Sequence, residues 1–545
     1  SLATNPDFLE KSPFLLRLYE LTNFSDQRLF VVMIGSFIVV TFCTKSLILW
    51  RVRVGIYSFS SRQQVILREK LMHAYLEAPY TFHLKKNSAH IINNVLSETF
   101  KFTYRVLNPF LDMVANAFVV VFMVVLLSFT SWVTVLSVLV IFLPLAYLFQ
   151  RFKASIAKWG KEGSDANQSI VRTINHGLGG IKETTIIGCG EYFKEQLVQE
   201  AERFSSSQKQ YYAFTVTPRI LIETLLVIFL IGLTSCFLLF AQDVSNLTAL
   251  LSVFAIASMR LIPAATQLAN GLGSLKNSSY TVNKLYTDLK ELDAAGTKSV
   301  GKITHAGWEG FRFNREIALH DLTYAYPDSN TASLDNLSLT IRKGESIALI
   351  GQSGAGKTTL VDVILGLLRP QSGDICVDGQ SIYSDIRAWQ NLVGYIPQSI
   401  FLIEDTIERN IAFGVHDHLI DAERLQKAIV AAQLSDLVDS LPNGVHTSVG
   451  ERGARLSGGQ RQRIGIARAL YHEREILVLD EATAALDNET ERLVTESIKA
   501  LSGTKTMIII AHRLTTVEHC DRVYYMKEGK ITRAGSYEEV VLANW

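Results

Sequence analysis

A strand, a glycine-rich loop and a helix that could together bind phosphate follow one another in the second half of the chain. The apolar strand "SIALI" and the apolar helix "LVDVILGLL" flank the loop Gly351-Gln352-Ser353-Gly354-Ala355-Gly356-Lys357-Thr358-Thr359. Glycines let backbone N–H groups wrap phosphate oxygens, and the helix N-terminus adds positive potential. Lys357 would reach the β and γ phosphates, and Thr358 would ligate Mg²⁺. The bare pattern should occur by chance in about 2% of chains this long. Because a strand also precedes the loop and a helix follows it, the sequence predicts ATP and Mg²⁺ as cofactors.

Two acids and a histidine follow other buried strands. Asp480 and Glu481 end "EILVLDE", and His512 ends "MIIIAH". Ligands of open α/β folds bind at the carboxyl ends of the strands. Asp480 is therefore a candidate magnesium ligand, Glu481 a candidate general base for an attacking water, and His512 a candidate γ-phosphate sensor. A lone histidine is more often structural, but its place at the same edge favours the catalytic role.

The surrounding sequence divides into two kinds of domain. At 545 residues the chain exceeds the size of one hydrophobic core. Long apolar stretches fill the first half to about residue 275, and the second half reads like a soluble α/β domain. The formal net charge of +1 gives no general attraction to nucleic acid. Five scattered cysteines, without a CxxC pair, predict neither a disulfide framework nor a zinc site.

Apolar stretches in the first half are long enough to cross about 30 Å of hydrocarbon, which takes roughly 20 residues. The alternative, that they are core helices of a large soluble protein, is disfavoured by runs such as "VVVFMVVLLSF". The five predicted spans are 28–50, 107–127, 132–150, 220–241 and 248–270.

The basic residues of the connections indicate the orientation of these spans. Lys and Arg number nine in residues 51–106 and ten in 151–219, and the short turns have none. By the positive-inside rule the long connections and the α/β half are cytoplasmic, which leaves residues 1–27 outside. Residues 11–23 form an apolar helical face, which predicts an amphipathic helix at the outer membrane surface. An external loop helix packed on protein fits the same pattern.

A short motif before the Asp480 strand gives the chain a family resemblance. With Leu456-Ser457-Gly458-Gly459-Gln460 in place, the sequence resembles an ATP-binding-cassette (ABC) exporter. The resemblance implies that the motif from Ser457 to Gln460 binds ATP held by an opposite subunit, that Gln398 contributes to magnesium binding and coupling, and that Tyr326 stacks on adenine. One such domain per chain then implies two chains, as a homodimer or with a different half-transporter.

The same resemblance implies a fold and its boundaries. We expect an α-helical type IV exporter transmembrane domain fused to an α/β P-loop ATPase domain. Such subunits have six spans and begin in the cytoplasm, so the first of the six would be missing from this chain. Coupling helices are expected near Ala89–Glu98 and Ile187–Phe193. The predicted parts are an external segment 1–27, a transmembrane domain 28–280, a linker 281–314 and a nucleotide-binding domain 315–545.

Three cations stand where hydrocarbon is expected, namely Lys45, Arg219 and Arg260. Each costs roughly 2.5 to 3.5 kcal/mol in a membrane centre, so such residues pair with an acid or line a polar cavity. Glu223 or Asp112 could be an acidic partner. The other interpretation is a basic cavity for an anionic head group, which arginine suits as a phosphate ligand.

"TPRILIE" and "MRLIPAA" around two of these cations resemble the flippases of bacterial protein N-glycosylation, which move polyprenyl-pyrophosphate-linked oligosaccharides across the inner membrane. The resemblance implies that Lys45, Arg219 and Arg260 hold the pyrophosphate. Lysine replaces an expected arginine at the first position. A peptide or hydrophobic-drug exporter is the alternative on the same scaffold. A non-transporting ATPase or ATP-regulated channel is disfavoured, because Glu481 and the signature motif are both kept.

Overall fold

The computed structural model describes residues 19, 27–129, 132–240, 245–294, 312–327, 329, 331–480, 488–511 and 513–542. The chain forms two compact units, Ser1–Val300 and Gly301–Trp545. The boundary falls within the predicted linker, although residues up to Ala294 of that linker are helical. The predicted outer amphipathic helix lies outside the described residues except for Tyr19, whose ring meets Phe30 edge-on at 5.1 Å.

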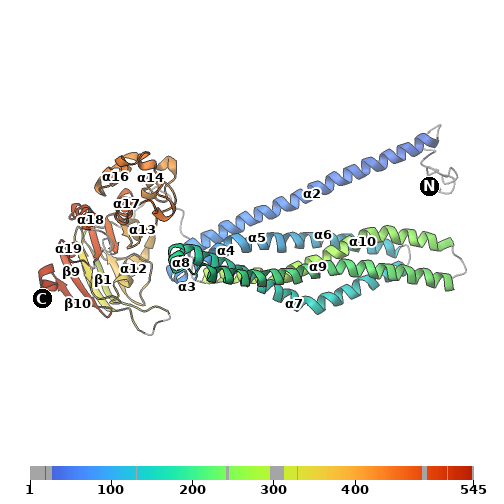
Figure 1. The fold of residues 1–545 in the computed structure, drawn as a ribbon, viewed down its shortest axis with the longest axis horizontal. Helices are drawn as coiled ribbons and strands as arrows, with labels where there is room; N and C mark the ends of the chain where they lie inside the picture. The colour runs from blue at the N-terminus through green and yellow to red at the C-terminus, as the bar shows by residue number, and fades with distance from the viewer. Residues whose placement is uncertain are drawn as a thin grey trace. The chain divides into compact units, whose positions relative to one another are not determined.

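Long helices build the first unit (Figure 1). They are α2 (Gln27–Glu77), α6 (Asn108–Ser128), α7 (Trp132–Gly179), α9 (Gly190–Phe240) and α10 (Ser245–Asn277). At 1.5 Å per residue, the 51 residues of α9 span about 75 Å, far beyond the hydrocarbon thickness. Each predicted apolar stretch falls almost entirely on one of these helices, and α2, α7 and α9 extend well beyond it. Three helical stretches within the searched part of the chain are long and apolar enough to cross a membrane, namely Val32–Glu77, Ser88–Leu126 and Gly190–Gly232.

Short elements gather at one end of this helical bundle (Figure 1). They are α3 (Tyr80–Lys85), α4 (Ser88–Asn93), the π-helix η2 (Asn94–Glu98), α5 (Thr99–Lys101), the π-helix η3 (Phe102–Leu107) and α8 (Ile181–Ile187). Helix α11 (Ser279–Ala294) follows α10 and ends this unit's described residues. The first coupling segment was expected at residues that α4 and η2 occupy. The second overlaps α8 only at Ile187, because Gly188 ends that helix with a φ of 74°.

Helices α6 and α10 are antiparallel neighbours with a defined register. A Cβ added at Gly271 of α10 would lie 3.2 Å from the Met113 side chain of α6. One turn further, the Asn116 amide donates to Gln267 Oε1 over 2.6 Å. Figure 1 shows the first part of α2 standing apart from α6, α7, α9 and α10. Arg53 of α2 forms an ion pair with Asp112 of α6, so the two helices meet at that level.

Two sheets form the framework of the second unit. The antiparallel sheet has the order β2-β1-β4-β5, and the larger sheet has the order β10-β9-β3-β8-β7-β6. Within the larger sheet all neighbours are parallel except β9 and β10. The strands are β1 (Glu316–Tyr324), β2 (Leu334–Arg342), β3 (Ser346–Ile350), β4 (Ser372–Val377), β5 (Gln380–Ser381), β6 (Val393–Ile396), β7 (Ile476–Asp480), β8 (Thr506–Ile510), β9 (Arg522–Lys527) and β10 (Lys530–Gly535).

Helices pack around this framework and complete two hydrophobic cores. One core joins both sheets around the fully buried Trp389, and the other joins the larger sheet to α14, α15 and α17. The helices are α12 (Lys357–Ile364), α13 (Ile386–Leu392), α14 (Ile407–Ile411), α15 (Ala422–Ala431), α16 (Ser435–Ser440), α17 (Gly458–Tyr471), α18 (Asn488–Ala500), α19 (Leu514–Val517) and α20 (Tyr537–Val540). The predicted fold class, a helical domain of apolar helices with an α/β P-loop domain, is confirmed.

Candidate active site

The glycine-rich loop joins β3 to α12. Gly356 caps α12 with a φ of 99°, and a Cβ there would lie 2.5 Å from the Ser333 carbonyl oxygen. Only glycine meets both demands. Gln352, Ser353, Gly354 and Thr358 are exposed, whereas Ala355 and Thr359 are buried. The loop therefore turns its phosphate-binding face to solvent and anchors itself through its buried residues.

Lys357 lies inside the loop that it follows. The side chain is 6% exposed, and Nζ donates to the carbonyls of Gly351 at 2.7 Å and Gln352 at 3.1 Å. These bonds hold the ammonium group where backbone N–H groups and the start of α12 also place positive potential. This is the arrangement expected of a triphosphate site.

Asp480 provides negative charge at the adjacent edge of the larger sheet. Asp480 lies at the end of β7 and is 8% exposed, and the Tyr395 hydroxyl donates to its Oδ2 over 3.4 Å. Burial, and then the negative charge of Asp480, raise the pKa of Asp362 in α12 to about 6. A cation relieves such crowding of carboxylates, and the Thr358 hydroxyl, Asp480 carboxylate and Gln398 amide are the oxygen donors that Mg²⁺ prefers. The site therefore fits the metal that the loop requires.

Glu481 and His512 lie outside the described residues. The parallel pairing of Asp480 with Ile510 does put the strands that precede them in register. Their catalytic roles stay predictions. Gln398 is exposed just beyond β6, where its backbone carbonyl accepts from Gln462 Nε2 at 2.7 Å. The sheet thus brings Lys357, Asp480 and Gln398 to the carboxyl ends of β3, β7 and β6. The sequence predicted this edge for Asp480, whereas Gln398 was named only through the family resemblance.

Tyr326 contacts the helix that follows the loop. Its hydroxyl lies 3.3 Å from Thr359 Oγ1, and its ring meets that of Tyr324 edge-on at 5.2 Å. The partly exposed ring lies beside the nucleotide loop, where the predicted adenine contact remains open to test.

The signature motif forms the start of α17. The Ser457 hydroxyl accepts from the Gln460 N–H at 3.2 Å, and Gln460 Oε1 accepts from the Ser457 N–H at 2.8 Å, which makes a capping box. Ser457 is exposed and Gly459 is buried. Helix α17 packs on α14 and α15 within the second core. Its free helix N-terminus suits an anion that comes from outside the chain.

The three cations of the first unit differ in their partners. Arg219 Nε donates to Glu223 over 2.8 Å, which confirms one of the two acids suggested for it. Asp112 was the other suggestion, but it pairs with Arg53. Lys45 Nζ lies 5.2 Å from the centre of the Phe42 ring. Among the described side chains, no carboxylate forms an ion pair with Lys45 or Arg260.

The cations also differ in depth along the bundle. Ile222 of α9 packs against Ala265 and Ala269 of α10, which sets the register of these antiparallel helices. Arg219 therefore lies roughly 10 to 15 Å from Arg260 along the bundle axis, at 1.5 Å per residue. Lys45 lies on a third helix, α2. Within one chain the structure does not gather the three cations into one cluster.

A buried polar network was not predicted from the sequence. It lies at the end of the bundle that carries α3, α4 and α8, which we call the inner end. Asp288 of α11, 3% exposed, accepts from the Tyr75 hydroxyl at 2.9 Å and from Asn94 Nδ2, and its Oδ2 lies 3.1 Å from His90 Nε2. Burial works to raise the pKa of Asp288, but the hydrogen bonds from His90 and Tyr75 outweigh it and hold that pKa below its usual value. Because the partners of Asp288 lie far from it in the sequence, no short motif predicts these contacts.

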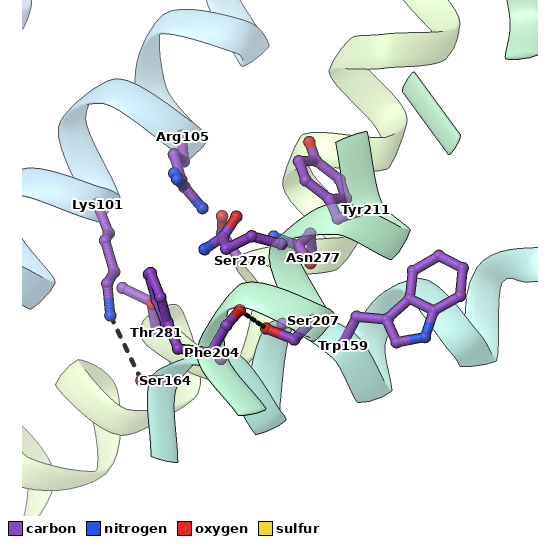
Figure 2. A pocket seen from close by; sticks show the side chains of 13 residues that line it. Lys101, Arg105, Trp159, Ser164, Phe204, Ser207, Tyr211, Asn277, Ser278 and Thr281 are labelled. Atoms are coloured by element: carbon purple, nitrogen blue, oxygen red, sulfur yellow. Dashed lines mark hydrogen bonds between the residues drawn. The ribbon is translucent and has the colours of Figure 1, made fainter. Parts of the chain in front are cut away.

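Figure 2 shows a small polar cavity elsewhere in the same unit, lined by Lys101, Arg105, Ser207 and Tyr211 among other residues. Lys101 Nζ lies 3.5 Å from Ser164 Oγ and 3.0 Å from Glu98. Glu98 is fully buried and also accepts from Thr281 Oγ1 at 2.7 Å. Glu98 and Asp288 together tie α11 to the elements around α4.

Comparisons with known proteins give one family for the chain. Residues 334–484 match the family described as ABC transporter. A Ralstonia nicotianae protein named ATP-dependent lipid A-core flippase is 30% identical over 500 residues, covering 88% of this chain and 80% of the relative. A Cupriavidus pinatubonensis protein of the same name is 29% identical over 488 residues, covering 89% and 81%. The solved structure of a bacterial Atm1-family ABC exporter with ATP bound superposes with a TM-score of 0.77 at 20% identity, covering 100% of this chain and 94% of that one.

Proposed function

The chain belongs to the ABC transporter family as an exporter half-transporter with an ATP-hydrolysing domain, and we propose that it uses this hydrolysis to flip an anionic lipid across a bacterial inner membrane. The proposed cargo is a polyprenyl-pyrophosphate-linked oligosaccharide. Its relatives are named for lipid A-core, another amphipathic glycolipid. The ATPase domain would lie in the cytoplasm, on the side of the lysine- and arginine-rich connections.

One observation carries the proposed cargo. Lys45 and Arg260 are exposed on apolar helices, and no described carboxylate pairs with them. Unpaired cations in this setting are costly unless an anion compensates them. A pyrophosphate on a lipid supplies two phosphate groups at membrane depth, and its polyprenyl chain can stay in the hydrocarbon. The charge of Arg219 is already balanced by Glu223, so Arg219 would contact the head group only transiently during transport.

The active unit would be a homodimer. Each chain carries one glycine loop with an exposed face and one signature motif whose Ser457 is exposed. Two copies can form two sites in which Lys357 of one subunit and Ser457 of the other contact the same ATP. Mg²⁺ would be held by Thr358, Asp480 and Gln398, Glu481 would polarise the attacking water, and His512 would contact the γ-phosphate. Tyr326 would stack on the adenine.

Transport would proceed by alternating access. Two ATP molecules would clamp the ATPase domains together, the coupling segments Ala89–Glu98 and Ile187–Phe193 would pass that movement to the long helices, and hydrolysis would reset the arrangement. Net transport in one direction requires that the affinity of the protein for the lipid differ between the inward-open and outward-open states. A head-group site of cations at different depths provides such a difference, because each state can expose another cation.

ATP hydrolysis in liposomes tests the cargo. We expect polyprenyl-pyrophosphate oligosaccharide to stimulate the rate, and Arg260→Ala to raise the half-maximal lipid concentration by about tenfold or more, because a charge-assisted hydrogen bond contributes about 1.5 to 3 kcal/mol. Met259→Ala, an exposed neighbour on the same helix, is the control. Stimulation by peptides or apolar drugs, with none by this lipid, would instead identify the alternative exporter.

A further inference from the structure

Four polar side chains form a layer across three helices of the first unit. They are Arg53 of α2, Asp112 and Asn116 of α6, and Gln267 of α10. Arg53 pairs with Asp112, and the Asn116 amide donates to Gln267 over 2.6 Å and to the Asp112 carbonyl over 2.7 Å. We call these four residues the polar belt. They join α2, α6 and α10 at one level of the bundle.

The polar belt lies one layer deeper than the two unpaired cations. Arg260 precedes Gln267 by seven residues of α10, which is about 10 Å at 1.5 Å per residue. Lys45 precedes Arg53 by eight residues of α2, which is about 12 Å. Both cations lie on the side of the α9–α10 turn, so the polar belt lies toward the end that carries α3, α4 and α8 (Figure 1).

Charge separates the two layers. Lys45 and Arg260 are cations without a described acidic partner, whereas the belt has one cation, one anion and two neutral amides. The Arg53 and Asp112 side chains keep 38% and 32% of their surface exposed, and Gln267 is exposed. Asp112 would repel a phosphate, and an apolar ligand would leave the remaining donors and acceptors of these groups without partners. A neutral ligand rich in hydroxyl groups, which both donate and accept, satisfies them.

We propose that the polar belt binds sugar hydroxyls of the transported lipid. This inference rests on the proposed function, because it assigns the sugar of the same substrate to the layer below its pyrophosphate. The sugar is attached to the pyrophosphate at the end opposite the polyprenyl chain. With the pyrophosphate at Arg260, the oligosaccharide extends toward the end of the bundle that carries α3, α4 and α8 and meets the belt. The polar belt then binds the sugar hydroxyls, and the cations bind the charged pyrophosphate.

Stimulation of ATP hydrolysis by two lipids tests the inference: polyprenyl pyrophosphate without sugar, and the same lipid with its oligosaccharide. Each protein is its own reference, since the ratio of the two half-maximal concentrations is compared. We expect the combined Asn116→Ala and Gln267→Ala substitutions to raise the half-maximal concentration of the glycosylated lipid by about tenfold, as loss of one or two hydrogen bonds predicts, without moving that of the bare lipid. Ser128→Ala, at the far end of α6, should change neither.

The outcomes separate the two proposals. If the wild type responds to both lipids with the same half-maximal concentration, or if the belt variant shifts both equally, the sugar-binding role is overturned and the proposed function stands. If neither lipid stimulates the wild type, both fall. Should the double variant lack a cooperative melting transition, Gln267→Ala alone serves, because Gln267 is exposed and its truncation opens no cavity in the bundle.

Discussion

The Tyr75 hydroxyl donates to Asp288 Oδ2 over 2.9 Å, and this bond joins the inner end of α2 to α11 across 213 residues of sequence. His90 and Asn94 contact the same carboxylate. Lys86, between α3 and α4, pairs with both Asp288 at 3.5 Å and Glu291 at 2.9 Å. These contacts therefore join α11 to the segment after α2 that carries α3, α4 and η2.

Removing the Asp288 carboxylate should destabilise the first unit. Asp288→Ala leaves Tyr75, His90 and Asn94 without their acceptor, which costs about 3 kcal/mol for a buried charged partner. We expect a lower melting temperature, and weaker stimulation of hydrolysis by lipid because α11 no longer moves with α4. Asp293→Asn, exposed on the same helix, should stay within about 0.5 kcal/mol of the wild type. Equal melting temperatures for the two variants would contradict the role given to the network.

Mixed dimers should show that the ATP sites are shared. A dimer of one Lys357→Ala chain and one Ser457→Arg chain keeps one site with an intact loop and an intact signature. A dimer of a chain with both substitutions and a wild-type chain keeps none. We therefore expect hydrolysis from the first mixture and only background from the second, measured on dimers purified through two different tags. Equal rates would contradict sites built from two subunits.

Gly356 should not tolerate a side chain. In Gly356→Ala the new Cβ meets the Ser333 carbonyl oxygen at 2.5 Å in a left-handed backbone conformation, so about 2 kcal/mol of strain falls on the loop. ATP affinity, measured by titration of a fluorescent nucleotide, should drop by about tenfold or more. Gly379→Ala has a similar φ of 88° with open space around its Cβ, and it should leave ATP affinity unchanged. An unaffected Gly356→Ala would show that the loop can shift.

The raised pKa of Asp362 predicts a pH-dependent stability. The folded protein binds this proton more tightly than the unfolded chain, whose carboxyl has the ordinary pKa of 3.8. Stability contributed by the protonated form is present below that value and is lost as the pH rises through about 6. Asp362→Asn should therefore melt higher than the wild type at pH 8 without Mg²⁺, and the gain should shrink at pH 5. Asp439→Asn, on the surface, is the control.

The ATP site could be predicted from the sequence because its signals are local. The glycine loop, the strand before Asp480 and the signature motif at Ser457 each lie within a few residues, and parallel strands bring their ends to one edge. Hydropathy located the apolar stretches but not the helix ends, because α9 continues through polar residues that cytoplasmic surroundings favour. The partners of Asp112 and Asp288 stayed hidden, since tertiary packing across 59 and 213 residues chooses them.

Direct measurement of flipping tests the central claim. Proteoliposomes with polyprenyl-pyrophosphate oligosaccharide are supplied with ATP and Mg²⁺, and the fraction of sugar reached by a glycosidase on the opposite side is followed with time. With the lipid near its wild-type half-maximal concentration, we predict ATP-dependent transfer by the wild type and by Met259→Ala, and transfer about fivefold slower by Arg260→Ala that still melts like the wild type. No ATP-dependent transfer by the wild type, or transfer by Arg260→Ala at the wild-type rate, would contradict a flippase that holds its lipid by this cation.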